Sequence, residues 1–126
     1  MRERTTPKEA VMKKLVLVAF NGEFMCFVHV LLNALDMKSR GYDVKIVIEG
    51  AATKVISELV VEGNPLKHLY QKVKDRRLID AVCRACSTKM NVLGAMEAEG
   101  LPLADEMSGH PSLARYIDAG YEVITF

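Results

Sequence analysis

The sequence predicts a doubly wound α/β sandwich of three layers, in which helices cover a mostly parallel sheet of about five strands. Short aliphatic runs rich in β-branched residues alternate along the chain with segments of helical periodicity. Glycine recurs at the ends of those helical segments. Strands of parallel sheets are buried on both faces and therefore read as continuous apolar runs, which is the pattern seen here.

Length and composition indicate a single domain. The chain has 126 residues, of which 50% are hydrophobic and 26% are charged, a mixture typical of globular proteins. We expect a flexible extension over residues 1–12 and one α/β domain over residues 13–126. The formal net charge is +1, so the chain as a whole predicts no direct binding to nucleic acid or to an anionic membrane.

The apolar run LVLVAF at residues 15–20 is far shorter than the roughly 20 residues that a membrane-spanning helix requires. No small-residue cleavage site follows this run, so it does not match a secretory signal. We therefore expect a cytoplasmic protein.

The N-terminal half predicts two strands, each followed by a helix. The run KKLVLVAF at 13–20 forms the first strand, and apolar side chains spaced i, i+3, i+4 from Phe24 predict a helix that ends at Gly41. A second strand over 42–50 follows at once. The next helix ends near Gly63.

The C-terminal half predicts the remaining elements. They are a short helix from Pro65, a strand over 78–83, a helix over 88–99, a short strand over 102–107, a helix from Pro111 to Gly120 and a strand over 121–126. Right-handed crossovers between such elements give a sheet of the flavodoxin or Rossmann type.

Two cysteines lie where ligand sites occur in such sheets, beyond the carboxyl ends of the strands. Cys83 ends the third strand and Cys86 lies at the entry of the following helix. The helix N-terminus and the charge of Arg84 favour a thiolate, so we expect a lowered cysteine pKa and a nucleophile at neutral pH. The alternative is that both cysteines are small buried hydrophobic residues.

Three chemistries fit this pair. With Cys26, the chain has three cysteines, and an odd number in a cytoplasmic protein disfavours a structural disulfide framework. A thiol redox motif of the thioredoxin type follows the first strand of its fold, whereas this one follows the third. A zinc site requires two further ligands, for which Cys26 and His29 are the candidates beside Cys83 and Cys86. The third chemistry is sulfur transfer.

Polar residues in two loops are further candidates for the same pocket. Asn21, Gly22 and Glu23 follow the first strand, but a turn with an acidic residue in the first helical turn is the simpler explanation of these residues. His110, in the segment SGHPS, precedes the last helix and can act as an acid or base if it reaches the cysteines. The alternative for His110 is an exposed loop residue.

The order of elements resembles the DsrE/DsrF-like family, which includes the YchN-like proteins and sulfur relay subunits related to TusD. The resemblance covers roughly residues 13–126 and rests on FNGE after the first strand, ALDMKSRGYDVKIVIEG, and VCRAC after the third strand. In sulfur relay members, the cysteine that ends the third strand receives sulfur as a persulfide, and Cys83 matches that position. Cys86 departs from the relay pattern, in which a small residue can stand there.

The resemblance implies a cytoplasmic sulfur carrier or sulfurtransferase without a cofactor, in which Cys83 accepts sulfane sulfur and Cys86 resolves or assists. It also implies a homo-oligomer, a trimer or hexamer, that exchanges sulfur with donor and acceptor proteins or with small sulfane-sulfur compounds. Two alternatives stay open: a noncatalytic oligomeric domain with a structural zinc or no cofactor, and a thiol redox protein that uses Cys83 and Cys86.

Overall fold

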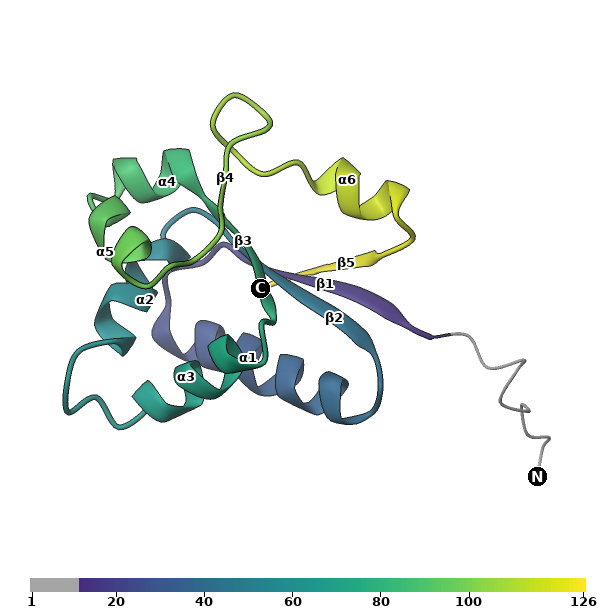
Figure 1. Cartoon of the computed structure of the whole chain (residues 1–126), viewed down its shortest axis with the longest axis horizontal. Helices are drawn as coiled ribbons and strands as arrows, with labels where there is room; N and C mark the ends of the chain where they lie inside the picture. The colour runs from purple at the N-terminus through teal and green to yellow at the C-terminus, as the bar shows by residue number, and fades with distance from the viewer. Residues whose placement is uncertain (1–11) are drawn as a thin grey trace.

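The computed structural model describes residues 12–126, and the extension expected over residues 1–12 lies almost entirely outside this range. The chain forms a five-stranded sheet in which every strand runs parallel to its neighbours, in the order β4-β3-β2-β1-β5 (Figure 1). The strands are β1 (Lys14–Ala19), β2 (Asp43–Ile48), β3 (Ile79–Cys83), β4 (Leu103–Ala104) and β5 (Glu122–Thr125). The predicted parallel α/β fold is confirmed.

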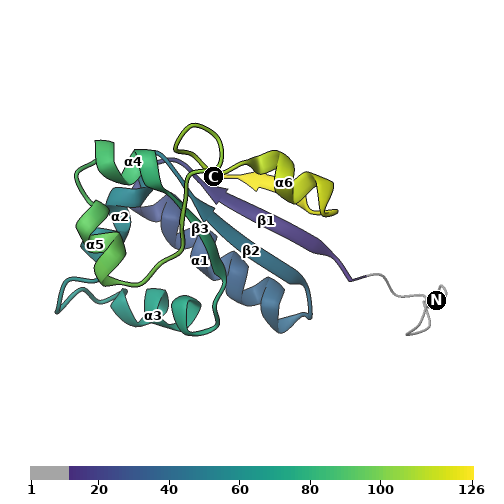
Figure 2. The same ribbon diagram turned by 45° about the horizontal axis from the view of Figure 1, so that its top comes forward.

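The helices cover the two faces of the sheet unequally. They are α1 (Phe24–Ser39), α2 (Ala52–Leu59), α3 (Lys67–Asp75), α4 (Arg84–Lys89), α5 (Leu93–Ala98) and α6 (Leu113–Asp118). Helices α1, α2, α3 and α5 pack on one face and share the larger hydrophobic core, whereas α6 lies on the other (Figure 2).

Core packing follows the same asymmetry. On the heavily covered face, Leu17, Ile46 and Ile48 pack against Phe27 and further buried side chains of the four helices. Complete burial of one such side chain stabilises the fold by roughly 1.5–3 kcal/mol. The opposite face has a smaller cluster, which consists of Val16, Val18, Val47, Ala81, Tyr116 and Tyr121.

An irregularity in β3 directs a carboxylate toward the thinly covered face. Ile46 of β2 pairs with Ile79 and Val47 pairs with Ala81, so Asp80 is an extra residue without a pairing partner. Such a bulge redirects side chains. The Tyr116 hydroxyl donates a hydrogen bond to Asp80 Oδ2 at 2.6 Å, and Lys45 Nζ lies 3.4 Å from Oδ1.

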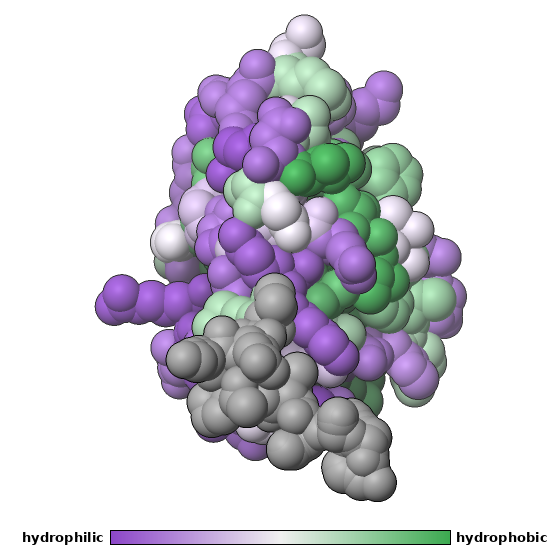
Figure 3. Space-filling model, turned by 90° about the vertical axis from the view of Figure 1, so that its right-hand side faces the viewer, coloured by the Kyte–Doolittle hydropathy of each residue, from purple (hydrophilic) through white to green (hydrophobic). Residues whose placement is uncertain are grey.

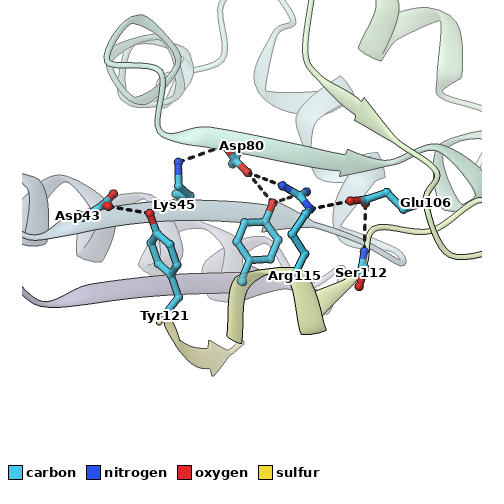
Figure 4. Close-up of polar contacts among 8 residues, drawn as sticks. Asp43, Lys45, Asp80, Glu106, Ser112, Arg115 and Tyr121 are labelled. Atoms are coloured by element: carbon cyan, nitrogen blue, oxygen red, sulfur yellow. Dashed lines mark hydrogen bonds and ion pairs between the residues drawn. The ribbon is translucent and has the colours of Figure 1, made fainter. Parts of the chain in front are cut away.

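Arg115 extends this group toward the loop between β4 and α6. Its Nη1 lies 3.9 Å from Asp80 Oδ2 and its Nε lies 2.6 Å from Glu106 Oε2. Figure 4 shows Arg115 between the two carboxylates. We call these residues the Asp80 cluster; its members are Asp80, Lys45, Tyr116, Arg115 and Glu106.

Two predicted elements differ from the structure. The helix expected over 88–99 is two short helices, because Asn91 takes a left-handed φ of 61° and interrupts the backbone between α4 and α5. As a result α4 begins at Arg84, earlier than predicted. The strand expected over 102–107 has only two residues, Leu103 and Ala104, because the chain turns away from the sheet into the loop that precedes α6.

Among the helices of residues 12–126, none combines the length and the apolar content that crossing a bilayer requires. Figure 3 shows hydrophobic side chains at the surface of the side that carries α6 and the edge strand β5. The large apolar side chains of these two elements that reach solvent are Ile117 and Ile124, with 59% and 38% exposure.

Candidate functional site

Cys83 lies at the junction of β3 and α4 and is completely buried. Its backbone is extended, with φ −64° and ψ 118°, so the strand ends there and the helix begins at the next residue. The side chain caps α4: the backbone N–H of Cys86 donates to Cys83 Sγ at 3.3 Å. A thiol thus occupies the capping position that a hydroxyl or carboxylate usually takes.

A tight turn brings His110 to this junction. Met107 and His110 exchange two backbone hydrogen bonds, of 2.8 and 3.0 Å, around Ser108 and Gly109. Both central residues have positive φ, 50° and 96°, as in the two-residue turns that join hairpin strands. The Gly109 carbonyl accepts a 2.8 Å hydrogen bond from the N–H of Ala85 in α4.

Gly109 is needed for this close approach as well as for the turn. A Cβ atom at this position would lie 3.1 Å from the Ala85 Cβ, which is tighter than ordinary packing allows. A larger residue at 109 would therefore push the turn away from α4. It would carry His110 with it.

The side chains of Cys83, Cys86 and His110 form one group, which we call the cysteine–histidine site. Cys83 Sγ lies 3.1 Å from His110 Nδ1, and Cys86 Sγ lies 3.9 Å from the same nitrogen. All three ligand atoms lie within 4.8 Å of one another. In the tautomer that is protonated at Nε2, His110 Nδ1 accepts a hydrogen bond from the Cys83 thiol.

The thiol of Cys83 is less acidic than the sequence suggested. Burial, followed by the side chain of Cys86 and the charge of Glu49, raises its pKa to about 12, and the backbone N–H of Cys86 only partly opposes this rise. The expected lowered cysteine pKa is therefore wrong for Cys83 in this conformation, because desolvation outweighs the helix terminus. At neutral pH a base must remove the proton before Cys83 reacts, and His110 is the adjacent base.

Glu49 is a functional candidate that the sequence analysis missed. It directly follows β2 and is 9% exposed. Burial raises the pKa of its carboxyl, while the charge of His110 opposes this shift. A carboxylate after the buried run IVI, at the carboxyl edge of a parallel sheet, was the available signal.

A cavity of about 320 Å³ opens beside the site. Its lining residues are Gly50, Ala85, Cys86, Lys89, Met90 and His110. Cys86 and His110 thus face a space that solvent or a small molecule can enter, with Lys89 supplying positive charge, whereas Cys83 lies behind them. Hollows of about 570 and 540 Å³ lie over the α2–α3 connection and beside the start of β1, and no cysteine lines either of them.

The predicted loop residues after β1 have local structural roles. Asn21 Oδ1 accepts a 2.6 Å hydrogen bond from the N–H of Glu23, and Glu23 Oε1 caps α1 by accepting from the N–H of Cys26 at 3.1 Å. Gly22 permits a close contact, since a Cβ there would lie 2.7 Å from the Ala51 Cβ. Of the other candidates, Arg84 is exposed.

The four residues considered for zinc are not gathered together. Cys26 and His29 lie on α1, where Cys26 is partly exposed and His29 is exposed. Within the described part of the chain, the group of close metal-ligand atoms consists of Cys83, Cys86 and His110. The structure therefore brings His110 to the cysteines and leaves Cys26 and His29 outside that group.

The Asp80 cluster holds the loop that carries His110. Glu106 accepts a 3.1 Å hydrogen bond from the backbone N–H of Ser112 and pairs with Arg115 at 2.6 Å (Figure 4). These bonds close the base of the loop on both sides of His110. The imidazole is thus positioned by contacts that reach back to Asp80 in β3.

Comparisons with known proteins agree with this architecture. The chain is 40% identical over 96 residues to an uncharacterized protein of Methanocaldococcus jannaschii, a match that spans 76% of each chain. An uncharacterized protein of Archaeoglobus fulgidus is 39% identical over 59 residues, which cover 47% of this chain and 95% of that one.

A conserved protein of unknown function from Bacteroides thetaiotaomicron has the same fold, with a TM-score of 0.69 and 17% sequence identity over 90% of this chain and 95% of that one. The sequence profile of the DsrE/DsrF-like family matches residues 12–126, which is nearly the whole chain. This protein therefore belongs to the DsrE/DsrF-like family.

Proposed function

We propose that this protein is a sulfur carrier in which Cys83 holds sulfane sulfur as a persulfide. The observation that supports this most directly is the 3.1 Å contact between Cys83 Sγ and His110 Nδ1, beside a cavity that opens to solvent. Family membership supports a role in sulfur relay. The sulfur is supplied by a donor persulfide or polysulfide and passes to an acceptor thiol.

The loading step needs one proton transfer and one bond exchange. His110 takes the proton of the Cys83 thiol, and the thiolate attacks the sulfane sulfur of the donor. A new S–S bond forms at Cys83 while the donor's S–S bond breaks, and the donor leaves as a thiolate that accepts the proton from His110. The backbone N–H of Cys86, 3.3 Å from Cys83 Sγ, stabilises negative charge on the sulfur.

Mass spectrometry tests this proposal. The reduced, chelator-treated protein is exposed to polysulfide, alkylated and mapped by peptide. We expect one additional sulfur atom on Cys83, no loading in Cys83→Ser or Cys83→Ala, and unchanged loading in the control Cys26→Ser. Loading that persists in a folded Cys83 variant would exclude Cys83 as the carrier.

A thiol redox role is the second candidate, because Cys86 lies one helical turn from Cys83 and both sulfurs contact His110. Attack of the Cys86 thiolate on the inner sulfur of a Cys83 persulfide forms the Cys83–Cys86 disulfide and releases hydrosulfide. Two equivalents of an external thiol then restore both cysteines and leave as their own disulfide. A disulfide without retained sulfur, in the same mass-spectrometric experiment, would favour this role.

We also propose that the protein assembles with further copies of itself. Ile117 of α6 and Ile124 of the edge strand β5 are exposed apolar side chains, and hydrophobic side chains reach the surface on the side that carries these two elements (Figure 3). An edge strand that has no further neighbour among residues 12–126 favours association. Light scattering of the purified chain measures the assembly. The variant Ile124→Lys is expected to weaken it.

A further inference from the structure

We propose that Cys83, Cys86 and His110 form a binding site for a thiophilic divalent cation, with Zn²⁺ as the occupant that fits their chemistry. Two sulfur ligands and one imidazole nitrogen are the donor set that zinc prefers among biological cations. The inference concerns the same side chains as the proposed sulfur carrier. It does not depend on that function, because metal binding is measured without a sulfur donor.

The distances match those that zinc imposes on its ligands. With Zn–S near 2.3 Å and Zn–N near 2.0–2.1 Å, the sulfur and nitrogen atoms of a tetrahedral site lie about 3.6 Å apart. The observed separations from His110 Nδ1, 3.1 Å to Cys83 Sγ and 3.9 Å to Cys86 Sγ, lie on either side of this value. Because all three ligand atoms lie within 4.8 Å of one another, side-chain rotation can bring them onto one ion.

The residues around the site stabilise Cys83 as a ligand and leave a fourth coordination position open. The backbone N–H of Cys86 can keep its hydrogen bond to Cys83 Sγ when that sulfur binds a cation. Such hydrogen bonds to metal ligands are common in metal sites. The cavity of about 320 Å³ adjoins Cys86 and His110 and gives access from solvent. Three protein ligands with an open position are the arrangement of a reactive zinc site, in contrast to the four ligands of a structural one.

Metal binding and sulfur loading exclude each other. Both thiols give up their protons to solvent as the ion forms two Zn–S bonds, and no electrons are transferred. A sulfur atom bonded to zinc is no longer free to attack a donor persulfide. Zinc would thus act as a reversible inhibitor of Cys83, and a chelator would restore the free thiols.

Competition titration against a chromophoric chelator tests the site in the full, reduced chain. We expect one Zn²⁺ per chain. Loss of a residue that only hydrogen-bonds to a metal ligand lowers metal affinity by roughly 10–100-fold. Because His110 is proposed as a direct ligand, His110→Ala should lower the Zn²⁺ affinity by more than this. His29→Ala and Cys26→Ser are matched controls that should bind like the unmodified chain.

Cobalt provides a second readout. Co²⁺ bound to the unmodified chain should show thiolate-to-metal charge transfer that Cys83→Ser and Cys86→Ser each weaken, and Zn²⁺ should protect both thiols from alkylation until chelator is added. Equal Zn²⁺ affinity of His110→Ala and the unmodified chain, loss of binding in Cys26→Ser, or unprotected thiols at saturating Zn²⁺ would each overturn the inference. Failure of sulfur loading in chelator-treated protein would leave these results unchanged and would count against the carrier function alone.

Discussion

Asp80 and Cys83 lie three residues apart on β3, and their side chains differ in the number of hydrogen bonds and ion pairs that they form. In the Asp80 cluster, the carboxylate accepts a hydrogen bond from Tyr116 and pairs with Lys45 and Arg115. In the cysteine–histidine site, Cys83 Sγ has one backbone donor and one imidazole within 3.5 Å, and a cavity adjoins its neighbours.

This difference indicates that the Asp80 cluster stabilises the structure, whereas the cysteine–histidine site is suited to a reaction. Groups that are fully paired with opposite charges and hydroxyls have little reason to react, because any new partner must displace an existing one. In the proposed mechanism, the buried Cys83 thiol instead passes its proton to His110 and then binds a sulfur atom or a metal ion. Variants in the two groups should therefore change different quantities.

The largest expected effect separates the two cysteines of the site. In Cys86→Ser, Cys83 should load and retain sulfur as in the unmodified chain. The release of sulfide through a Cys83–Cys86 disulfide, which the redox role requires, should be absent because no second thiol can attack the persulfide. A sulfide electrode and peptide mapping after polysulfide treatment measure both. Undiminished sulfide release without added thiol would show that Cys86 is not the resolving residue.

The next effect compares His110 with a member of the Asp80 cluster. His110→Ala should slow loading of Cys83 by about 10²–10⁴-fold near neutral pH, the usual contribution of a positioned base. The control Tyr116→Phe removes a hydroxyl from the Asp80 cluster and should load at nearly the unmodified rate. Rates follow from alkylation quenched at successive times, and equal rates in the two variants would contradict the division between the groups.

Variants of the Asp80 cluster should change the stability of the fold more than they change the loading rate. Asp80→Ala leaves the Tyr116 hydroxyl and Lys45 without their acceptor and leaves Arg115 paired with Glu106 alone. It should lower the free energy of unfolding by about 1–3 kcal/mol. The control is Asp36→Ala. Its partner Arg40 lies 3.1 Å away at the exposed C-terminal end of α1, where an ion pair of this spacing contributes about 0.3–0.5 kcal/mol.

Urea unfolding of both variants measures the difference. Equal destabilisation by Asp80→Ala and Asp36→Ala would mean that the Asp80 cluster contributes no more than a surface ion pair. If sulfur loading is as slow in Asp80→Ala as in His110→Ala, the Asp80 cluster is required to position His110 for the reaction, and the two groups do not act separately.

The smallest effect concerns Glu49 and pH. Because the folded state raises the pKa of this carboxyl, its ionisation costs stability, and that cost grows as pH rises through the unfolded and then the folded pKa. Glu49→Gln lacks this ionisation, so its stability relative to the unmodified chain should increase from acid toward neutral pH. Unfolding free energies across this range measure the trend, and a difference that falls with pH would contradict the sign.

The sheet could be predicted from sequence because its signals are local. The strands β1 and β2 lie within the expected ranges 13–20 and 42–50, since buried parallel strands leave continuous aliphatic runs. The division of the helix expected over 88–99 was missed because one left-handed residue, Asn91, does not interrupt the apolar periodicity.

The site was only partly predictable. Cys83 and Cys86 follow from their position at a strand end, but the partnership with His110 spans 27 positions and depends on the turn at Ser108 and Gly109. Sequence spacing does not reveal the path of the β4–α6 loop, which carries His110. Cys26 and His29 were therefore considered as the further zinc ligands in its place. The raised pKa of Cys83 depends on burial, which composition does not reveal.

The bulge in β3 also has an evolutionary consequence. Because Asp80 is the unpaired residue, Ile79, Ala81 and Val82 already alternate between the two cores. Deletion of a single codon at this position would leave those side chains facing as they do now and would remove only the carboxylate. A lineage can thus gain or lose the anchor of the His110 loop in one genetic event while the rest of the strand keeps its phase.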